Sequence, residues 1–320
     1  MPDEFQTCPE LTTVMVCASP RAGSGKKREQ IPKLTERLER AGFTVKLTDS
    51  IDAIRKQIAA SVDADERSLV VVAAGGDGTV SLVAELTPPE FPIVPMPLGT
   101  ENLLARHYGF SANAEDVFQC ITRGTDHTID AGRANGKLFL VMASCGFDAE
   151  VVRDVHLRRR GHIHRLSYLR PILRAVRKYR FPQLHIELAI NGTTMASQKA
   201  HWAMTFNLPC YAANLRIEPS AIADDGKLDL ITFAKGTRAS GLAYVASVMV
   251  GRHLRREDVV RTRATQITIR SDRRVPYQLD GDYVGRLPLM IETLPRRVRL
   301  RMPPKQPSTR DVAERKRSIR

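Results

Sequence analysis

Short apolar runs alternate with helical patterns along the first part of the chain. Four apolar runs predict buried strands and lie at Thr13–Ala18, Phe43–Leu47, Leu69–Ala74 and Ile93–Pro95. Apolar residues at helical spacing predict helices over 29–40, 51–60 and 79–86, and a further helix that Ser111 caps and that ends near Ile121. Strands that alternate with helices in this way predict a doubly wound parallel sheet that helices cover on both faces.

The pattern changes near residue 128, where strands begin to follow one another. Seven runs predict strands: Thr128–Ala134, Lys137–Cys145, Leu184–Asn191, Lys199–Asn207, Lys227–Ala234, Gln266–Arg270 and Leu289–Leu294. The Asn-Gly pairs at 135–136 and 191–192 are typical of hairpin turns. Helices are expected over about 164–180, where the sequence is rich in arginine, and over Ser240–Val250. The second half is therefore expected to be an antiparallel, β-rich sandwich domain.

These changes of pattern divide the chain. We expect an α/β domain over 12–130 and a β-rich domain over 131–303. The segments 1–11 and 304–320 are polar, and we expect both to be flexible tails.

The net charge of +14 favours an anionic partner, and much of it is concentrated in the arginine-rich stretch. A basic helix over 158–180 is either a solvated basic face or a site that attracts an anionic membrane surface, where each charge contributes about 1 kcal/mol. No aromatic residues alternate with these charges, and no zinc-finger or helix-turn-helix pattern occurs. We therefore expect no nucleic-acid partner.

The location expected from the sequence is the cytoplasm, with peripheral attachment to a membrane. No run of 18 apolar residues occurs, and the first residues lack a signal-peptide pattern. The five cysteines have neither disulfide-like nor metal-like spacing, which is typical of reduced thiols. The oligomeric state is open, and a homodimer is one arrangement considered.

The candidate chemistry begins at Val70–Val83, where an apolar strand runs into a glycine turn and then a helix. Glycines at Gly75, Gly76 and Gly78 allow the backbone to approach a ligand closely, and a helix N-terminus attracts phosphate. Asp77 places a carboxylate where a phosphate-bound metal ion or a reacting hydroxyl would lie. The turn is a candidate phosphate-binding loop.

Two further turns follow strands in the same half. The turn at Ser19–Lys27 is not a P-loop, because Pro20 and Lys27 stand where that motif needs glycine and Ser/Thr, but its small and basic residues suit a phosphate. The third turn is Pro97–Asn102. Since parallel strands end at one edge of a sheet, the three turns are expected to share a crevice.

Two acidic stretches lie far downstream, at Ala223–Asp229 and Gln278–Asp282. Each reads either as an ordinary turn or as a source of carboxylates that meet phosphates bound on the first domain. Phosphoryl transfer uses such carboxylates to orient a hydroxyl or to bind Mg²⁺.

Five motifs together resemble the diacylglycerol kinase catalytic family, which includes bacterial lipid kinases and the sphingosine and ceramide kinases. They occur in family order as GGDGT at 75–79, PLGTENLLAR at 97–106, CGFDAEVV at 145–152, ADDGKLDL at 223–230 and QLDGD at 278–282. The resemblance covers roughly 12–303. It implies two domains with a cleft between them and transfer of the γ-phosphate of ATP to a lipid hydroxyl, with Mg²⁺.

The resemblance also implies roles for individual residues. The implied ATP site comprises Ser19, Pro20, Gly23, Thr48, Gly75, Gly76, Asp77, Gly78, Thr79, Thr100 and Asn102. Asp225 is implied to hold a structural Mg²⁺. Asp282 falls at the position of the general base, and Asp280 and Asp77 are the alternatives for that role.

Three departures from the family pattern stand out. The first loop begins with Ser19 in place of asparagine, and Ser81-Leu82 replaces an Asn-Glu pair after the glycine turn. Asp282 replaces glutamate, so its carboxylate reaches about an ångström less, and this is why the alternative bases are kept.

Three functions are compared. The first is an ATP-dependent kinase that phosphorylates a lipid such as diacylglycerol. The second is a kinase for a soluble substrate on the same fold, similar to an NAD kinase, although Asp224-Asp225-Gly226 fits the lipid branch better. The third is a nucleotide-binding protein that lacks catalysis.

Overall fold

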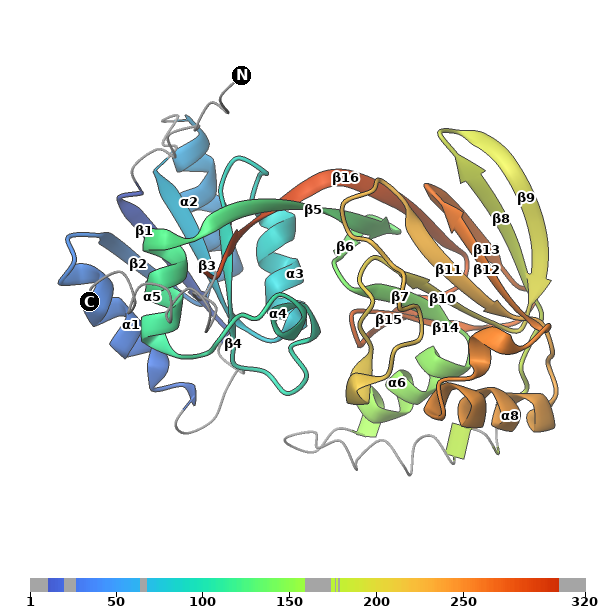
Figure 1. Cartoon of the computed structure of the whole chain (residues 1–320). Helices are drawn as coiled ribbons and strands as arrows, with labels where there is room; N and C mark the ends of the chain where they lie inside the picture. Colours follow the sequence, from blue (N-terminus) through green and yellow to red (C-terminus); the bar gives the residue numbers. More distant parts are fainter. Residues whose placement is uncertain are drawn as a thin grey trace, which may run out of the picture.

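The protein was analysed as a computed structural model that describes residues 11–19, 27–63, 68–158, 174, 175, 177 and 179–304. Two halves lie side by side, each with its own layers, and a pair of long strands runs from one half to the other (Figure 1). Within the described ranges no helix is long and apolar enough to cross a lipid bilayer.

The N-terminal half is a parallel sheet in the order β2-β1-β3-β4. Its strands are β1 (Thr13–Ala18), β2 (Thr44–Thr48), β3 (Leu69–Gly75) and β4 (Ile93–Pro97). Every residue of β3 is buried, as expected for a central parallel strand covered on both faces. The predicted parallel sheet is confirmed.

Helices cover both faces of this sheet and are α1 (Gln30–Glu39), α2 (Ile51–Asp63), α3 (Asp77–Leu86), α4 (Leu103–His107) and α5 (Ala114–Arg123). Helix α1 contacts α5, and α2 contacts α3. Right-handed crossovers place these two pairs on opposite faces (Figure 1). Helix α1 buries the apolar face that was predicted for the first helix, through Ile31, Leu34 and Leu38.

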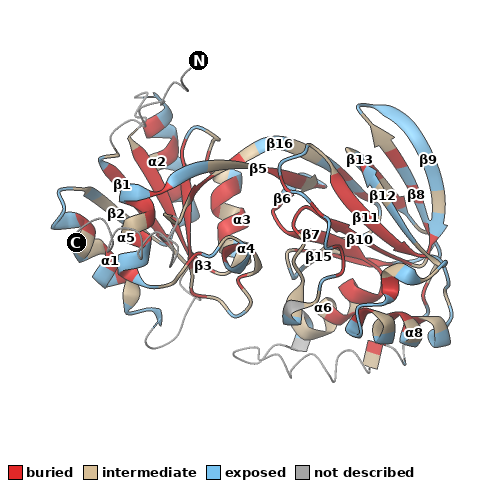
Figure 2. Ribbon diagram, in the orientation of Figure 1, coloured by how far each residue is buried: buried red, intermediate tan, exposed pale blue. Residues whose placement is uncertain are grey.

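The C-terminal half is a sandwich of two antiparallel layers. One layer has the order β12-β11-β10-β7-β14-β15. Its strands are β7 (Met142–Cys145), β10 (Trp202–Phe206), β11 (Leu228–Phe233), β12 (Val259–Ala264), β14 (Pro276–Leu279) and β15 (Asp282–Arg286). The facing layer contains β5 (Thr125–Ala134), β6 (Lys137–Phe139), β8 (Leu184–Ile190), β9 (Thr193–Ala200), β13 (Gln266–Arg270) and β16 (Leu289–Met302). Side chains from both layers, such as Ile186, Leu230 and Ile267, share one buried core. Figure 2 colours the buried residues of both layers red.

Helices and short turns close one side of the sandwich. They are α6 (Phe147–Arg158), α8 (Arg238–Met249) and the 3₁₀ turns η3 (Ala212–Asn214) and η4 (His253–Arg255). Helix α8 begins with a capping box between Thr237 and Ser240, which satisfies the first backbone N–H groups of the helix.

Strand β16 joins the two halves. It pairs with β13 at one end and follows β5 along most of its length. Near its other end, Leu300 lies beside Ile93 of β4. A register shift between Leu294 and Val298 bends the strand, and the Asp130 carboxylate accepts a hydrogen bond from the Arg296 amide at this bend, at 2.7 Å. The two domains are therefore linked by continuous strands rather than by a loose linker.

Several predicted elements differ from those observed. The cap of α5 is Asn113, whose side chain accepts from Glu115 N and Asp116 N, so the prediction of Ser111 as the cap is wrong. The run Lys137–Cys145 forms two strands, β6 and β7. The chain between them does not pair in a sheet, because the amides of Leu140 and Val141 donate hydrogen bonds to the Asp280 carboxylate.

The run Lys199–Asn207 is also two strands, because the chain passes there from one layer of the sandwich to the other. Sequence patterns missed β9, β12, β14 and β15. The arginine-rich helix predicted over 164–180 falls mostly outside the described residues, although Arg174 and Ala175 are helical.

We predict that Gly132→Ala destabilises the sandwich. A Cβ at Gly132 of β5 would lie 2.0 Å from the Phe139 ring on β6, so the ring or the strand has to move. Overpacking of this kind costs about 1–3 kcal/mol in the free energy of unfolding. Chemical denaturation of the wild type and of Gly132→Ala measures this cost.

The control is the same substitution in a Phe139→Ala background. With the ring removed, Gly132→Ala should cost less than about 0.5 kcal/mol, since the clash no longer exists. An equal cost in both backgrounds would contradict the proposed contact.

Candidate active site

Two glycine turns of the N-terminal half lie against each other. A Cβ at Gly99 would lie 2.7 Å from the Gly76 Cα, so glycine is required where the backbones approach. Asn102, with φ of 49°, accepts from the Gly99 N–H at 3.0 Å and donates to the Gly99 carbonyl at 2.9 Å. These bonds fix the shape of the third turn, and the close approach of Gly99 to Gly76 places that turn beside the glycine turn.

The first turn reaches the same edge. The Lys27 amine is 3.4 Å from the Gly99 carbonyl, and the Ser19 N–H donates to the Ala74 carbonyl at 3.1 Å. Strands β1, β3 and β4 are also neighbours in the sheet. The second and third turns therefore meet as predicted, and the two ends of the first turn, Ser19 and Lys27, lie at the same edge; Pro20 and Gly23 lie outside the described residues.

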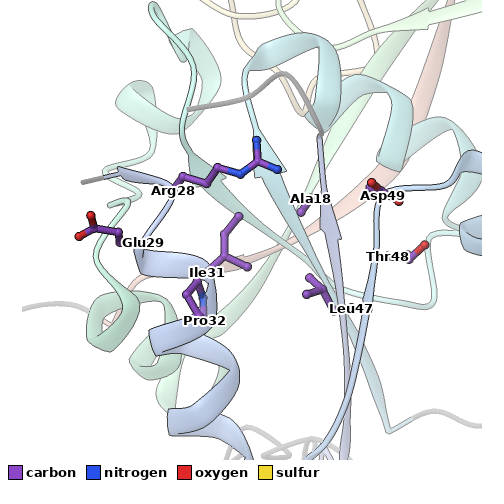
Figure 3. A pocket seen from close by; sticks show the side chains of 8 residues that line it. All are labelled: Ala18, Arg28, Glu29, Ile31, Pro32, Leu47, Thr48 and Asp49. Atoms are coloured by element: carbon purple, nitrogen blue, oxygen red, sulfur yellow. The ribbon is translucent and has the colours of Figure 1, made fainter. Parts of the chain in front are cut away.

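A cavity of about 700 Å³ opens between α1 and the ends of β1 and β2, beside the described ends of the first turn, and its volume is in the range of sites that hold small molecules. Figure 3 shows its lining side chains, which come from the end of β1, the start of α1 and the residues at and after the end of β2. They are Ala18, Arg28, Glu29, Ile31, Pro32, Leu47, Thr48 and Asp49. The predicted ATP residue Thr48 therefore lines a cavity, while Thr100 is an exposed residue of the third turn.

Asp77 holds the third turn in place. Its carboxylate oxygens accept from Leu103 N at 2.9 Å and from Leu104 N at 3.1 Å, at the start of α4. Burial raises the pKa of Asp77 to about 6, although these two hydrogen bonds act in the opposite direction. Because both oxygens face backbone amides, the geometry gives Asp77 a positioning role and offers little support for the predicted catalytic one.

Asp280 connects the two halves. Its carboxylate accepts from Ser81 Oγ of α3 at 2.6 Å, and from the amides of Leu140, Val141 and Met142 at 2.8–2.9 Å. Burial raises the pKa of Asp280 above its ordinary value, and the four donors favour the charged form. Its oxygens are saturated, so Asp280 is poorly suited to take a proton from a substrate. Ser81, which departs from the family pattern, supplies one of these donors.

Asp282 differs from both of these acids. It is exposed at the start of β15, and its Oδ2 would lie 3.0 Å from a Cβ built at Gly78 of the glycine turn. Among the described residues it accepts no hydrogen bond through its side chain. Of the three predicted catalytic acids, Asp282 is the one whose carboxylate is free to meet a ligand bound at the glycine turn.

A buried polar cluster that sequence reasoning left without a role supports this turn. The carboxylate of Asp148, at the start of α6, accepts from the hydroxyls of Ser144 and Tyr211 and from the Gln278 amide. The other end of Gln278 accepts from Gly281 N at 2.8 Å, between the two acids of the turn. Burial raises the pKa of Asp148. The sequence contained a signal for this cluster, because Asp148 lies within the CGFDAEVV motif.

Asp225, the predicted metal ligand, is paired with a cation of the protein. Its carboxylate bonds to the Arg263 guanidinium, which also lies 3.3 Å from Asp229 Oδ1. Over the described ranges, no group of three or more His, Cys, Asp or Glu could hold a metal ion. As arranged, these residues do not fit a bound metal ion, and the assignment of Mg²⁺ to Asp225 stays a prediction.

Two family models match the chain in succession. Residues 13–134 match the diacylglycerol kinase catalytic domain, and residues 141–302 match the YegS C-terminal NAD kinase beta sandwich-like domain. The second match alone covers half of the chain.

Similar proteins span nearly the whole chain. The diacylglycerol kinase of Bacillus subtilis is 24% identical over 293 residues, which cover 89% of this chain and 94% of that protein. The diacylglycerol kinase of Staphylococcus haemolyticus is 26% identical over 300 residues, with 89% and 86% covered. A crystal structure of a diacylglycerol kinase from Bacillus anthracis aligns with a TM-score of 0.65 at 21% identity, over 95% of this chain and 99% of that one. This last likeness shows a shared fold.

We predict opposite behaviour for the two acids of one turn. Asp280→Ala should lower the free energy of unfolding by about 3 kcal/mol or more, because it leaves buried backbone donors without an acceptor. Asp282→Ala should change it by less than about 0.5 kcal/mol, because the side chain is exposed. Denaturant titration of the two variants distinguishes them, and equal effects would contradict the assignment of a structural role to Asp280 alone.

A second prediction concerns pH. The pKa of Asp77 is raised to about 6 in the folded protein, so the unfolded chain ionises first as the pH rises from about 4 to 6. As the pH rises from about 4 to 6, ionisation of the Asp77 carboxyl lowers the free energy of unfolding by roughly 1–3 kcal/mol in total. Asn cannot ionise, so the stability of Asp77→Asn should improve relative to the wild type between about pH 4 and pH 7. A difference in the free energy of unfolding between Asp77→Asn and the wild type that does not change with pH would contradict this prediction.

Proposed function

The chain belongs to the diacylglycerol kinase catalytic-domain family, and from this premise we propose that it is an ATP-dependent lipid kinase. In the proposed reaction it transfers the γ-phosphate of ATP to a hydroxyl of a lipid such as diacylglycerol. The family supports the kinase assignment. The lipid acceptor is the further step, which rests on the names of relatives that are about one-quarter identical.

The observation that carries the proposal is the position of Asp282. One domain supplies the glycine turn at the N-terminus of α3, and the other supplies an exposed carboxylate directly over Gly78. A nucleotide with its base in the cavity beside Thr48 would place its phosphates along the three turns. The γ-phosphate would then lie between the two domains, close to Asp282.

In this arrangement Asp282 acts as the general base. The oxygen of the acceptor hydroxyl forms a bond to the γ-phosphorus while the bond from that phosphorus to the bridging oxygen of ADP breaks. The hydroxyl proton passes to the Asp282 carboxylate, which later releases it to water. Asp280 and Gln278 hold the turn that carries this carboxylate, and Asp77, within the glycine turn that faces it, holds the third turn alongside.

Kinases use ATP with a divalent metal ion, typically Mg²⁺, which offsets negative charge on the phosphate oxygens. Lys27 and Arg28 add positive charge from the protein at the same edge. The proposal therefore includes ATP and Mg²⁺ as cofactors, with no residue of this chain assigned to the metal ion.

We predict that the purified chain, with γ-labelled ATP and Mg²⁺, labels a lipid in a total lipid extract. Asp282→Asn should lower the turnover number by at least about 100-fold while ATP still binds, because general-base catalysis contributes about 10²–10⁴-fold. The labelled product is identified by mass, and ATP affinity is measured by titration calorimetry.

Glu292→Gln is the matched control, since this exposed acid lies on β16 and pairs with Arg133 rather than facing the glycine turn. It should retain full turnover. If label appeared only in an added soluble acceptor such as NAD, the lipid kinase proposal would be wrong. The alternative of a kinase for a soluble substrate would then hold. ATP binding without any labelled acceptor would support the alternative of a nucleotide-binding protein without catalysis.

A further inference from the structure

Helix α8 is apolar on both of its faces, although only one face is needed for packing. Its sequence, RASGLAYVASVM, has one charged residue, which is the first. The inner face buries Gly241, Tyr244 and Val248. A Cβ at Gly241 would lie 2.1 Å from the Phe181 ring, and the Tyr244 hydroxyl accepts from Lys235 N at 2.9 Å. The inner face therefore fixes the helix firmly on the sandwich.

The outer face presents large apolar side chains to solvent. Leu242 is 56% exposed, Met249 is 67% exposed and Val250, just after the helix, is 68% exposed. Ala239 and Ala246 on the same helix are also exposed. Apolar residues gathered in this way on one helix are typical of an interaction surface. We call Leu242, Met249 and Val250 the α8 outer face.

Basic side chains stand at both ends of this face. Arg238 begins the helix, and Arg252 and Arg255 follow it, all three exposed. Within the part of the chain that the structure describes, none of the three forms an ion pair. An apolar strip flanked by arginines matches a bilayer surface, where the strip enters the acyl boundary and the guanidinium groups meet anionic headgroups.

The neighbouring helix α6 lies on the same side of the sandwich as α8 (Figure 1). Leu157, in the last turn of α6, is 65% exposed. In Figure 2 parts of the α8 ribbon are coloured as exposed. Helix α6 also carries Asp148 at its start, so this side of the domain is connected to the candidate active site.

We propose that the α8 outer face docks the protein on an anionic lipid bilayer, with the helix lying in the plane of the interface. The inference rests on the proposed function, because a kinase for a membrane lipid has to reach its acceptor there. It names a surface for the contact that differs from the basic stretch 158–180.

Charge favours a bilayer over a second copy of this chain. In a two-fold symmetric contact the outer face would meet itself, with the helices antiparallel or parallel. Arg238 of one copy would then lie near Arg252 and Arg255 of the other, or near its own counterpart, and in both arrangements like charges would repel. An anionic bilayer meets the same arginines with charge of opposite sign.

The test measures sedimentation of the full chain with vesicles, without ATP. In low salt, the wild type should sediment with vesicles of equal parts phosphatidylglycerol and phosphatidylcholine, and less with phosphatidylcholine alone. Leu242→Asp/Met249→Asp should lower the bound fraction of protein by about tenfold or more, because two apolar contacts are lost and two negative charges are added. Arg252→Gln/Arg255→Gln should weaken binding to the anionic vesicles specifically.

Met195→Asp is the matched control, because Met195 is 63% exposed but lies on β9, away from α8. It should bind vesicles as the wild type does. The circular dichroism spectrum and the denaturation midpoint of the α8 variant should match those of the wild type, which shows that the variant is folded. Because binding is measured without ATP, loss of binding remains interpretable even if no kinase activity exists.

Three results would overturn the inference. They are a wild type that does not bind anionic vesicles, an α8 variant that binds as well as the wild type, and a wild-type dimer that dissociates in the α8 variant. The last result would make the α8 outer face a contact between copies of this chain.

Discussion

The candidate site depends on the hydrogen bonds that the Asp280 carboxylate accepts. It belongs to the C-terminal half, yet it accepts a hydrogen bond from Ser81 on the helix that follows the glycine turn. Its remaining bonds come from the three amides where the chain leaves one layer of the sandwich for the other. A single side chain thus fixes the turn that carries Asp282 and its position over the glycine turn of the other domain.

Such an arrangement explains how a carboxylate can be exposed and still well placed. Asp280 and Gly281 are both held by buried groups, through the amides near Leu140 and through Gln278. Asp282 follows them directly and needs no bond of its own to be positioned. Because these supporting bonds go to Asp280 and Gly281, the oxygens of Asp282 stay available to a ligand, as its proposed role of general base requires.

The sequence predicted the parallel sheet and the meeting of the second and third turns, because buried parallel strands such as Leu69–Gly75 are continuous apolar runs. It missed β9 and β15, whose residues are largely exposed or half-buried and carry no apolar alternation. It also could not separate the roles of Asp77, Asp280 and Asp282. Those roles depend on which backbone amides meet each carboxylate, and these amides lie between 26 and 140 residues away along the chain.

Continuity between the domains has a consequence for catalysis. Because β16 pairs with β13 at one end and lies beside β4 at the other, a hinge motion has to bend a paired strand. The strand already bends between Leu294 and Val298, where Asp130 accepts from Arg296 N and also from Gly226 N of the acidic loop. If the two halves close on a nucleotide in the proposed reaction, the motion is therefore expected at this bend, and the acidic loop that Asp130 holds would move with it.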